Sequence, residues 1–129
     1  MKVEKLIKLA INARNNAYAP YSNFKVGACV LAKSGKTYVG CNVENASFGA
    51  TNCAERTAIF SAIANGEKNF ECIAIVGSNK DEFAFPCGIC RQVLAEFGDF
   101  EVIVAKNEQD YKKFMLSDLL PNSFNKKSF

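Results

Sequence analysis

Histidine and tryptophan are both absent from this chain of 129 residues. Imidazole is the side chain that ordinarily titrates near neutral pH, so proton transfer falls to carboxylates or to a water molecule held by a metal. No run of about 18 apolar residues occurs, which excludes a membrane-spanning helix. Residues 1–8 mix charged with apolar side chains and contain no signal-peptide core, so we expect a cytoplasmic protein.

A strong excess of charge is also missing. The 16 Lys and Arg residues and the 13 Asp and Glu residues give a net charge of +3, and the basic residues are spread along the chain. So small and dispersed a positive charge does not indicate a nucleic-acid partner. Apolar residues make up 49% and charged residues 22%, the proportions of a globular protein. The length fits one domain, which we expect to span residues 1–129.

Hydrophobic periodicity predicts a layered α/β fold. Residues 3–17 have the spacing of an amphipathic helix, and two β-rich runs joined by the turn at 33–36 predict a hairpin. Further helices alternate with strands, an order that favours right-handed crossovers with parallel strands in the middle of the sheet. The expected ranges are strands 25–32, 37–43, 70–77, 101–105 and 111–115, helices 53–65 and 87–97, and a helical turn at 117–120.

Three of the six cysteines are placed to bind a metal, since disulfides are not expected in a reducing compartment. Cys87 and Cys90 form a C-x-x-C pair at the start of one predicted helix, and Cys53 opens the other, at the carboxyl ends of strands. A redox dithiol would need only the pair, whereas three thiolates with an open fourth position describe a catalytic zinc. The other cysteines fall in predicted strands and are interpreted as small buried residues: Cys29, Cys41 and Cys72.

Glu55 is the carboxylate beside this trio, and we predict that it transfers protons. It follows Cys53 by two positions, which on a regular helix would turn the two side chains about 200° apart, unless Cys53 occupies the non-helical cap position. Zn²⁺ with three thiolates is negative by one charge, which weakens the ion as a Lewis acid. Helix N-termini and the guanidinium groups of Arg56 and Arg91, as donors to the thiolates, are predicted to offset that charge.

Two residues at the end of the second hairpin strand suggest a sugar. Asn42 and Glu44 are spaced i, i+2 and therefore project from the same face of a strand. An amide beside a carboxylate suits a pair of sugar hydroxyls. Phe24, at the end of the aromatic loop 18–24, is predicted to lie against a flat base.

Four motifs occur together in this chain: AYAPYSNF at 17–24, NVENA at 42–46, CAERTA at 53–58 and PCGICRQ at 86–92. In combination they resemble the small homotetrameric cytidine deaminases of nucleoside salvage, over nearly the whole chain. Zinc deaminases of this kind use three cysteine ligands and a glutamate that is not a ligand. The resemblance implies a three-layer α/β/α domain with a mixed five-stranded sheet, Zn²⁺ as cofactor, and hydrolytic deamination of cytidine and deoxycytidine to uridine and deoxyuridine plus ammonia.

The resemblance also assigns roles to single residues. It implies that Ala54 offers backbone groups to the pyrimidine edge and that Arg56 hydrogen-bonds the ligand sulfurs. The family closes its site across subunits, which implies that Phe48 and Phe124 cap the pocket of another copy. We therefore expect a homotetramer with a nucleoside substrate and with no nucleic-acid or membrane partner. Two residues depart from the family pattern: Phe48 replaces the usual Tyr and lacks its hydroxyl, and Ile89 replaces the usual Ala and adds bulk.

Three other functions share part of the pattern. A deaminase that edits nucleic acids would need a positive groove for the backbone, which the charge does not supply. A blasticidin-type deaminase shares the zinc site, but the runs at 42–45 and 55–58 fit cytidine better. A zinc-stabilised interaction module would normally hold four protein ligands and would leave Glu55 without a role.

Overall fold

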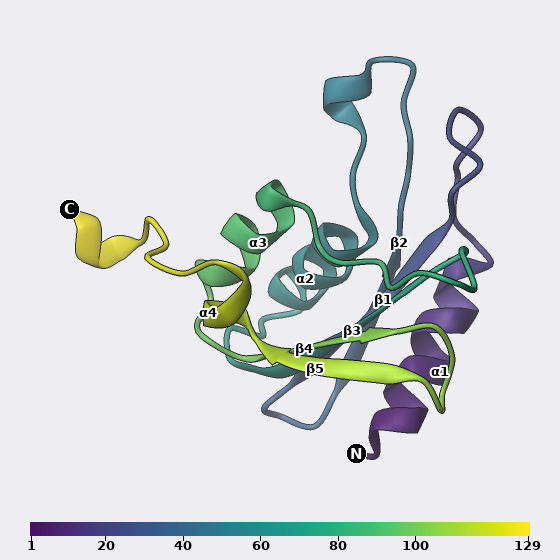
Figure 1. Cartoon of the computed structure of the whole chain (residues 1–129). Helices are drawn as coiled ribbons and strands as arrows, with labels where there is room; N and C mark the ends of the chain where they lie inside the picture. Colours follow the sequence, from purple (N-terminus) through teal and green to yellow (C-terminus); the bar gives the residue numbers. More distant parts are fainter.

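The structure, a computed structural model, describes residues 1–129 as a mixed five-stranded sheet with helices on both faces (Figure 1). The strand order is β2-β1-β3-β4-β5. Only β3 and β4 are parallel neighbours; β1 pairs antiparallel with both β2 and β3, and β5 pairs antiparallel with β4. The elements are α1 (Val3–Arg14), β1 (Val26–Ala32), β2 (Thr37–Cys41), η1 (Phe48–Ala50), α2 (Ala54–Ala64), β3 (Phe70–Gly77), α3 (Gly88–Ala95), β4 (Glu101–Ala105), β5 (Tyr111–Met115), α4 (Leu116–Leu119) and η2 (Lys126–Ser128).

Two hydrophobic cores lie on opposite faces of this sheet, because successive side chains of a strand point to opposite sides. In β1, Ala28 and Val30 belong to the core under α2, whereas Cys29 and Leu31 belong to the core under α1. Strand β3 contributes to both cores, which accounts for its nearly continuous apolar sequence. The predicted three-layer α/β/α arrangement is confirmed.

Strands β3, β4 and β5 have the predicted bounds, and the differences lie elsewhere. Helix α1 ends at Arg14 rather than at residue 17, because the next residues turn toward the end of β2, where the Tyr18 N–H donates to the Asn42 carbonyl at 3.0 Å. Strand β2 ends at Cys41 rather than at 43, since Val43 forms isolated bridges with Tyr18 and Asn52. Helices α2 and α3 are shorter at both ends than predicted, and α4 begins one residue earlier. Only β3 and β4 pair in parallel. Strands β2 and β3, which the crossover through α2 connects, are not neighbours, because β1 lies between them and pairs antiparallel with both.

The first turn of α2 lies very close to β2 because Gly40 has no side chain. A Cβ atom at Gly40 would lie 2.4 Å from the Ala58 nitrogen and 2.6 Å from the Ala54 oxygen, both closer than van der Waals contact allows. This close packing fixes the start of α2, where Cys53 and Glu55 lie, against the sheet.

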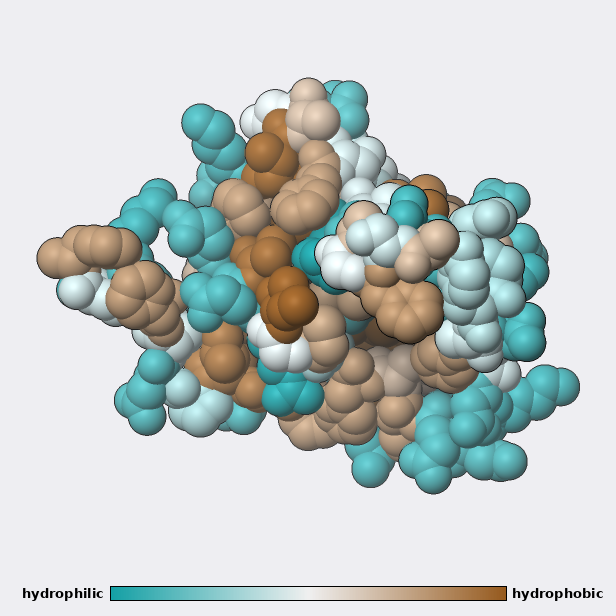
Figure 2. All heavy atoms as spheres, turned by 90° about the horizontal axis from the view of Figure 1, so that it is seen from above, coloured by the Kyte–Doolittle hydropathy of each residue, from teal (hydrophilic) through white to brown (hydrophobic).

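Loops from several segments gather at one end of the sheet, at the top of Figure 1. Seen from above in Figure 2, this end shows a broad apolar band with hydrophilic residues mostly around it. The exposed large apolar residues of these loops and of the start of α3 are Tyr18, Tyr21, Phe24, Val43, Phe48, Phe85 and Ile89. The C-terminal segment extends away from the body (Figure 1, yellow). None of the helices has both the length and the apolar character needed to cross a membrane.

Candidate functional site

Three cysteine sulfurs meet between the starts of α2 and α3. The Sγ atoms of Cys53, Cys87 and Cys90 all lie within 4.8 Å of one another, and those of Cys53 and Cys87 are 4.0 Å apart. Cys90 is buried, Cys53 is half-buried and Cys87 is exposed. Sequence spacing linked only Cys87 and Cys90. The fold brings Cys53, which lies 34 positions before Cys87, to the same point.

Cys53 and Cys87 both occupy helix N-cap positions. Their backbones are extended, with φ −75° and ψ 157° at Cys53 and φ −69° and ψ 172° at Cys87. The free N–H groups and the positive dipole end of each helix therefore lie next to a sulfur, where they stabilise a thiolate. Because Cys53 is a cap residue, Glu55 lies in the first turn of α2 and faces the same cavity as the cluster.

Arg56 brings positive charge to the cluster. Its Nη2 donates to Cys53 Sγ at 3.4 Å and to the Thr51 carbonyl at 3.4 Å. A hydrogen bond from the Cys90 thiol, together with the Arg56 guanidinium, lowers the pKa of Cys53 to about 5. The same hydrogen bond, and burial, raise the pKa of Cys90. In the metal-free protein, one thiolate is thus held by a thiol and a guanidinium.

The cluster fits a zinc ion. A tetrahedral ion with Zn–S distances of ~2.3 Å separates its sulfur ligands by ~3.8 Å, and the Cys53 and Cys87 sulfurs are 4.0 Å apart. The buried Nε of Arg56 has no hydrogen-bond partner, and its guanidinium also interacts with Cys90, whose thiolate as a ligand would supply an acceptor. Three protein ligands leave one coordination position for water or substrate, as in catalytic zinc sites.

Glu55 is the buried carboxyl group of this site, with only 4% of its surface exposed. Burial raises the pKa of Glu55 to about 7. A carboxyl group with such a pKa can both accept and donate a proton near neutral pH.

A cavity of about 330 Å³ opens beside the cluster. It is lined from five separate parts of the chain by Ser22, Phe24, Val26, Asn42, Glu44, Thr51, Cys53, Ala54, Glu55, Ile75, Ala84, Phe85 and Cys87. The volume is in the range of pockets that hold small molecules. Two of the three cysteines predicted for the metal therefore lie around one space with the residues predicted for proton transfer, sugar and base, and the third, Cys90, is buried behind it.

Asn42 is buried and uses its amide to fix the loop that precedes β1. Its Oδ1 accepts from the Val26 N–H at 2.8 Å, and its Nδ2 donates to the Phe24 carbonyl at 2.8 Å. An amide can form four hydrogen bonds, so one donor and one acceptor position remain for a ligand.

Glu44 holds the same loop from the other side. Its carboxylate accepts from the N–H groups of Tyr21 at 2.9 Å and Ser22 at 3.1 Å, and from the Ser22 hydroxyl. These bonds, the one from the hydroxyl foremost, lower the pKa of Glu44. Glu44 is therefore an ionised acceptor at the cavity wall.

The ring of Phe24 reaches the cavity across Gly77, the last residue of β3. A Cβ atom at Gly77 would lie 2.9 Å from Phe24 Cζ and 2.9 Å from Ala84 Cβ. The ring and Ala84 thus occupy the space that a side chain would fill. Arg14 donates to the Gly77 carbonyl at 2.7 Å, which ties this point to α1.

Arg91 does not have its predicted role as a donor to a thiolate. Its Nε donates to the Pro86 carbonyl at 2.7 Å and its Nη1 to the Leu119 carbonyl at 2.7 Å. Both of these acceptors are carbonyl oxygens, and neither is a cysteine sulfur. It joins the start of α3 to the end of α4 instead.

Phe48 and Phe124 lie outside the cavity of their own chain. Phe48 is 76% exposed, and its ring meets that of Tyr21 with centroids 6.0 Å apart. Phe124 is 60% exposed on the C-terminal segment, where its carbonyl accepts from Gln92 Nε2 at 2.8 Å. Their contact with a second copy stays a prediction.

Sequence reasoning did not assign part of the cavity wall. Ala84 and Phe85 belong to a loop without periodicity, and only the position of Phe85 two residues before Cys87 hinted at the site. Ser22 and Thr51 stand two residues from Phe24 and Cys53, a proximity that could have identified them. Val26 and Ile75 also line the cavity.

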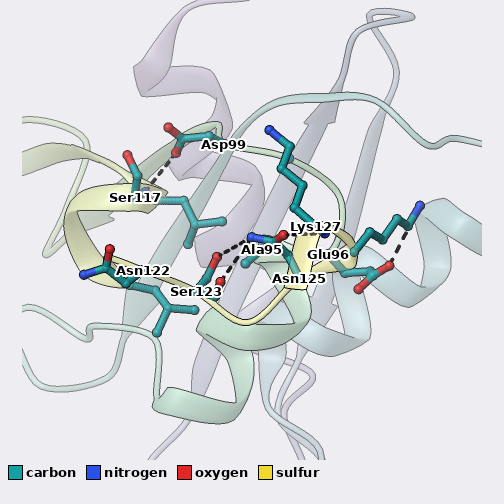
Figure 3. A pocket seen from close by; sticks show the side chains of 12 residues that line it. Ala95, Glu96, Asp99, Ser117, Asn122, Ser123, Asn125 and Lys127 are labelled. Carbon is teal, nitrogen blue, oxygen red and sulfur yellow. Dashed lines mark hydrogen bonds and ion pairs between the residues drawn. The ribbon is translucent and has the colours of Figure 1, made fainter. Parts of the chain in front are cut away.

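A second hollow, of about 490 Å³, lies between the end of α3, α4 and the C-terminal segment (Figure 3). Its lining includes carboxylates that are already engaged: Asp99 accepts from the Ser117 N–H at 2.8 Å, and Glu96 lies 4.0 Å from Lys126. No metal-ligating cluster lies here. This hollow therefore has no group of metal ligands like the three cysteines of the first site.

Comparisons with known proteins agree with this geometry. A family model described as the cytidine and deoxycytidylate deaminase zinc-binding region matches residues 1–106. The cytidine deaminase of Sporosarcina psychrophila is 45% identical over 128 residues, which cover 98% of this chain and 93% of that protein. The cytidine deaminase of Halalkalibacterium halodurans is 47% identical over 126 residues, which cover 96% of this chain and 95% of that protein.

Solved structures show the same similarity. The crystal structure of cytidine deaminase from Burkholderia pseudomallei has a TM-score of 0.90 and 50% identity, covering 96% of this chain and 100% of that one. The corresponding enzyme from Mycobacterium tuberculosis has a TM-score of 0.84 and 36% identity, covering 96% and 98%. With a zinc-binding family match over most of the chain and a cysteine cluster placed for the metal, this chain belongs to the cytidine deaminases, a family of hydrolytic zinc enzymes.

Proposed function

We propose that this enzyme converts cytidine and deoxycytidine to uridine and deoxyuridine with release of ammonia. The observation that supports this most is the position of the buried Glu55 beside two metal-site cysteines, in the cavity that Asn42 and Glu44 also line. Together these residues offer a metal position, a proton carrier and two groups suited to a sugar.

The metal would be held by Cys53, Cys87 and Cys90. A zinc ion held there would supply a nucleophile derived from water at neutral pH. Glu55 accepts a proton from the water molecule whose oxygen bonds to C4 of the base, and it delivers a proton to the exocyclic amine, so that ammonia leaves as the carbon–nitrogen bond at C4 breaks. The pKa of about 7 that burial gives this carboxyl suits both transfers. Arg56 stabilises the thiolate of Cys53 throughout.

Substrate recognition is assigned to the other cavity residues. Asn42 directs its remaining donor and acceptor, and Glu44 its ionised carboxylate, to the hydroxyls of the ribose. Phe24 lies against the base. The backbone N–H of Ala54, at the first position of α2, has no partner within the helix and is offered to the pyrimidine edge.

We further infer a homotetramer in which Phe48 and Phe124 cap the cavity of a neighbouring copy. Both side chains are large, apolar and mostly exposed, as interface residues are in an isolated subunit. We assign the chain to one domain over residues 1–129, acting on free nucleosides in pyrimidine salvage in the cytoplasm, without a nucleic-acid or membrane partner.

A comparison of cytidine, deoxycytidine and cytosine tests the substrate assignment, with deamination followed by ultraviolet absorbance. Both nucleosides should react, and cytosine should react at least about a hundredfold less efficiently, because it leaves the polar groups of the sugar site unpaired. Glu44→Gln should slow the deamination of both nucleosides and so reduce the difference in efficiency between them and cytosine. Equal efficiency on cytosine would remove the ribose role of Asn42 and Glu44.

A further inference from the structure

The loop that joins β3 to α3 forms one wall of the cavity and is held by side chains. Residues 78–86 make no backbone–backbone hydrogen bond. Two of them, Ala84 and Phe85, line the cavity beside Cys87. Since backbone bonds do not fix this wall, its position depends on the contacts of its aromatic residues and on Arg91, which bonds the Pro86 carbonyl.

Phe83 is the first anchor of this loop. The Nζ atoms of Lys106 and Lys112 lie 4.6 Å and 5.0 Å from the centroid of its ring. Both lysines come from the segment where β4 ends and β5 begins, and such contacts between an ammonium group and a ring are favourable. The ring also packs against the core under α2.

Phe85 is held by a second aromatic contact. Its ring centroid lies 5.4 Å from that of Phe114 in β5, with the two planes inclined by 58°. Phe114 packs against the same core and gives Phe85 a fixed support. Phe85 is nevertheless 44% exposed, which leaves part of its ring free at the cavity.

We propose that Phe85 determines substrate specificity by limiting the space next to the metal site, and that Phe114 positions it. This inference rests on the proposed function. Phe85 precedes Cys87 by two residues, so this part of the wall lies beside a metal-site cysteine. The amine is bonded to C4, whose ring neighbours are N3 and C5; with N3 turned toward the proton carrier Glu55 and the N–H of Ala54, C5 is left on the side of the wall that Phe85 forms. A substituent at C5 therefore meets the ring of Phe85.

The test uses the zinc-loaded enzyme with cytidine and 5-methylcytidine, and the readout is the ratio of kcat/KM for the two substrates. Phe85→Ala should raise this ratio in favour of 5-methylcytidine by about tenfold, the smallest effect expected for one carbon in an apolar pocket. Phe85→Leu should raise it by less, and Phe85→Tyr, which keeps the ring, should leave it unchanged.

Phe114→Leu tests the positioning role. It frees the Phe85 ring and should also raise the ratio. The matched control is Phe97→Leu, because Phe97 is an aromatic residue that packs on the core residue Phe70, with centroids 6.2 Å apart, and does not line the cavity. The control should lower thermal stability without changing the ratio.

The outcomes separate this inference from the function on which it rests. Normal cytidine turnover with an unchanged ratio in both Phe85→Ala and Phe85→Leu would overturn the specificity role. An equal rise in Phe97→Leu would overturn the positioning role of Phe114. Absence of cytidine turnover in the zinc-loaded wild type would instead contradict the proposed function.

Discussion

Arg56 Nη2 lies 3.4 Å from Cys53 Sγ, so a guanidinium group donates directly to one sulfur of the metal cluster. Three thiolates would otherwise leave a zinc site with excess negative charge. We expect Arg56 to relieve that charge, because it donates to a sulfur of the cluster, whereas Arg91 donates to two carbonyl groups.

Arg56→Met should therefore weaken zinc binding while the fold persists, because methionine keeps an apolar stem but no donor. Residues that hydrogen-bond metal ligands typically contribute about 10- to 100-fold to metal affinity. We expect a loss of zinc affinity of that size in Arg56→Met, measured by competition with a chelator. Arg91→Met is the matched control and should affect zinc less. Equal zinc affinity in the wild type and Arg56→Met would contradict the role of the guanidinium.

In the metal-free protein, Cys53 should be the cysteine that reacts fastest at neutral pH. Its pKa is lowered to about 5, so the thiolate is present above that pH and is lost as the pH falls through it. Burial raises the pKa of Cys29 to about 12 and that of Cys72 to about 11, so these stay unreactive thiols.

The measurement is the rate of alkylation by iodoacetamide between about pH 4 and pH 10, a range that includes the ordinary thiol pKa, resolved by peptide mass spectrometry. Added zinc should protect Cys53. A reaction midpoint near the ordinary thiol value of about 8.5 would show that Cys53 is not stabilised as a thiolate.

Gly77→Ala should displace the ring of Phe24. The new methyl group would lie 2.9 Å from Phe24 Cζ and from Ala84 Cβ, and the ring is the part that can move. We expect a higher KM for cytidine, unchanged zinc content, and a stability loss of about 1 to 3 kcal/mol from overpacking. The control is Gly49→Ala, where a methyl group meets open space. Wild-type KM in Gly77→Ala would show that Phe24 does not contact the base.

Deletion of residues 121–129 should weaken assembly and raise KM while zinc stays bound, since all three cysteines lie elsewhere in the chain. Leu119 must be kept, because its side chain packs against the core and its carbonyl accepts from Arg91. Light scattering at assay concentration, combined with kinetics, tests this. A truncated protein with the assembly state and KM of the full chain would contradict a site shared between copies.

Strands β3 and β4 could be placed from the sequence because their apolar patterns are nearly unbroken, whereas β5, which also has the predicted bounds, contains two lysines. Strand β3 joins two cores and is apolar almost throughout, so its bounds follow from composition alone. The end of α1 could not be predicted in this way, because it depends on the bond between the Tyr18 N–H and the Asn42 carbonyl, 24 residues away.

The site shows the same division. The cysteines and Glu55 could be predicted because metal and proton chemistry restricts residue type and spacing. Phe85 could not, because its place in the wall depends on Phe114, a residue of a distant strand. The prediction that Arg91 donates to a thiolate was wrong, because sequence spacing indicates which residues lie near one another and not which hydrogen bonds a long side chain forms.

The proposed deaminase activity and the proton-transfer role of Glu55 are tested most directly by the deamination of cytidine by zinc-loaded wild type and by Glu55→Gln, with uridine and ammonia both quantified and zinc measured in each protein. The wild type should release the two products in equal amounts. Glu55→Gln should keep its zinc and lose turnover by the factor of about 10² to 10⁴ that general acid–base catalysis contributes. Near-normal turnover in zinc-loaded Glu55→Gln would show that Glu55 does not carry the proton.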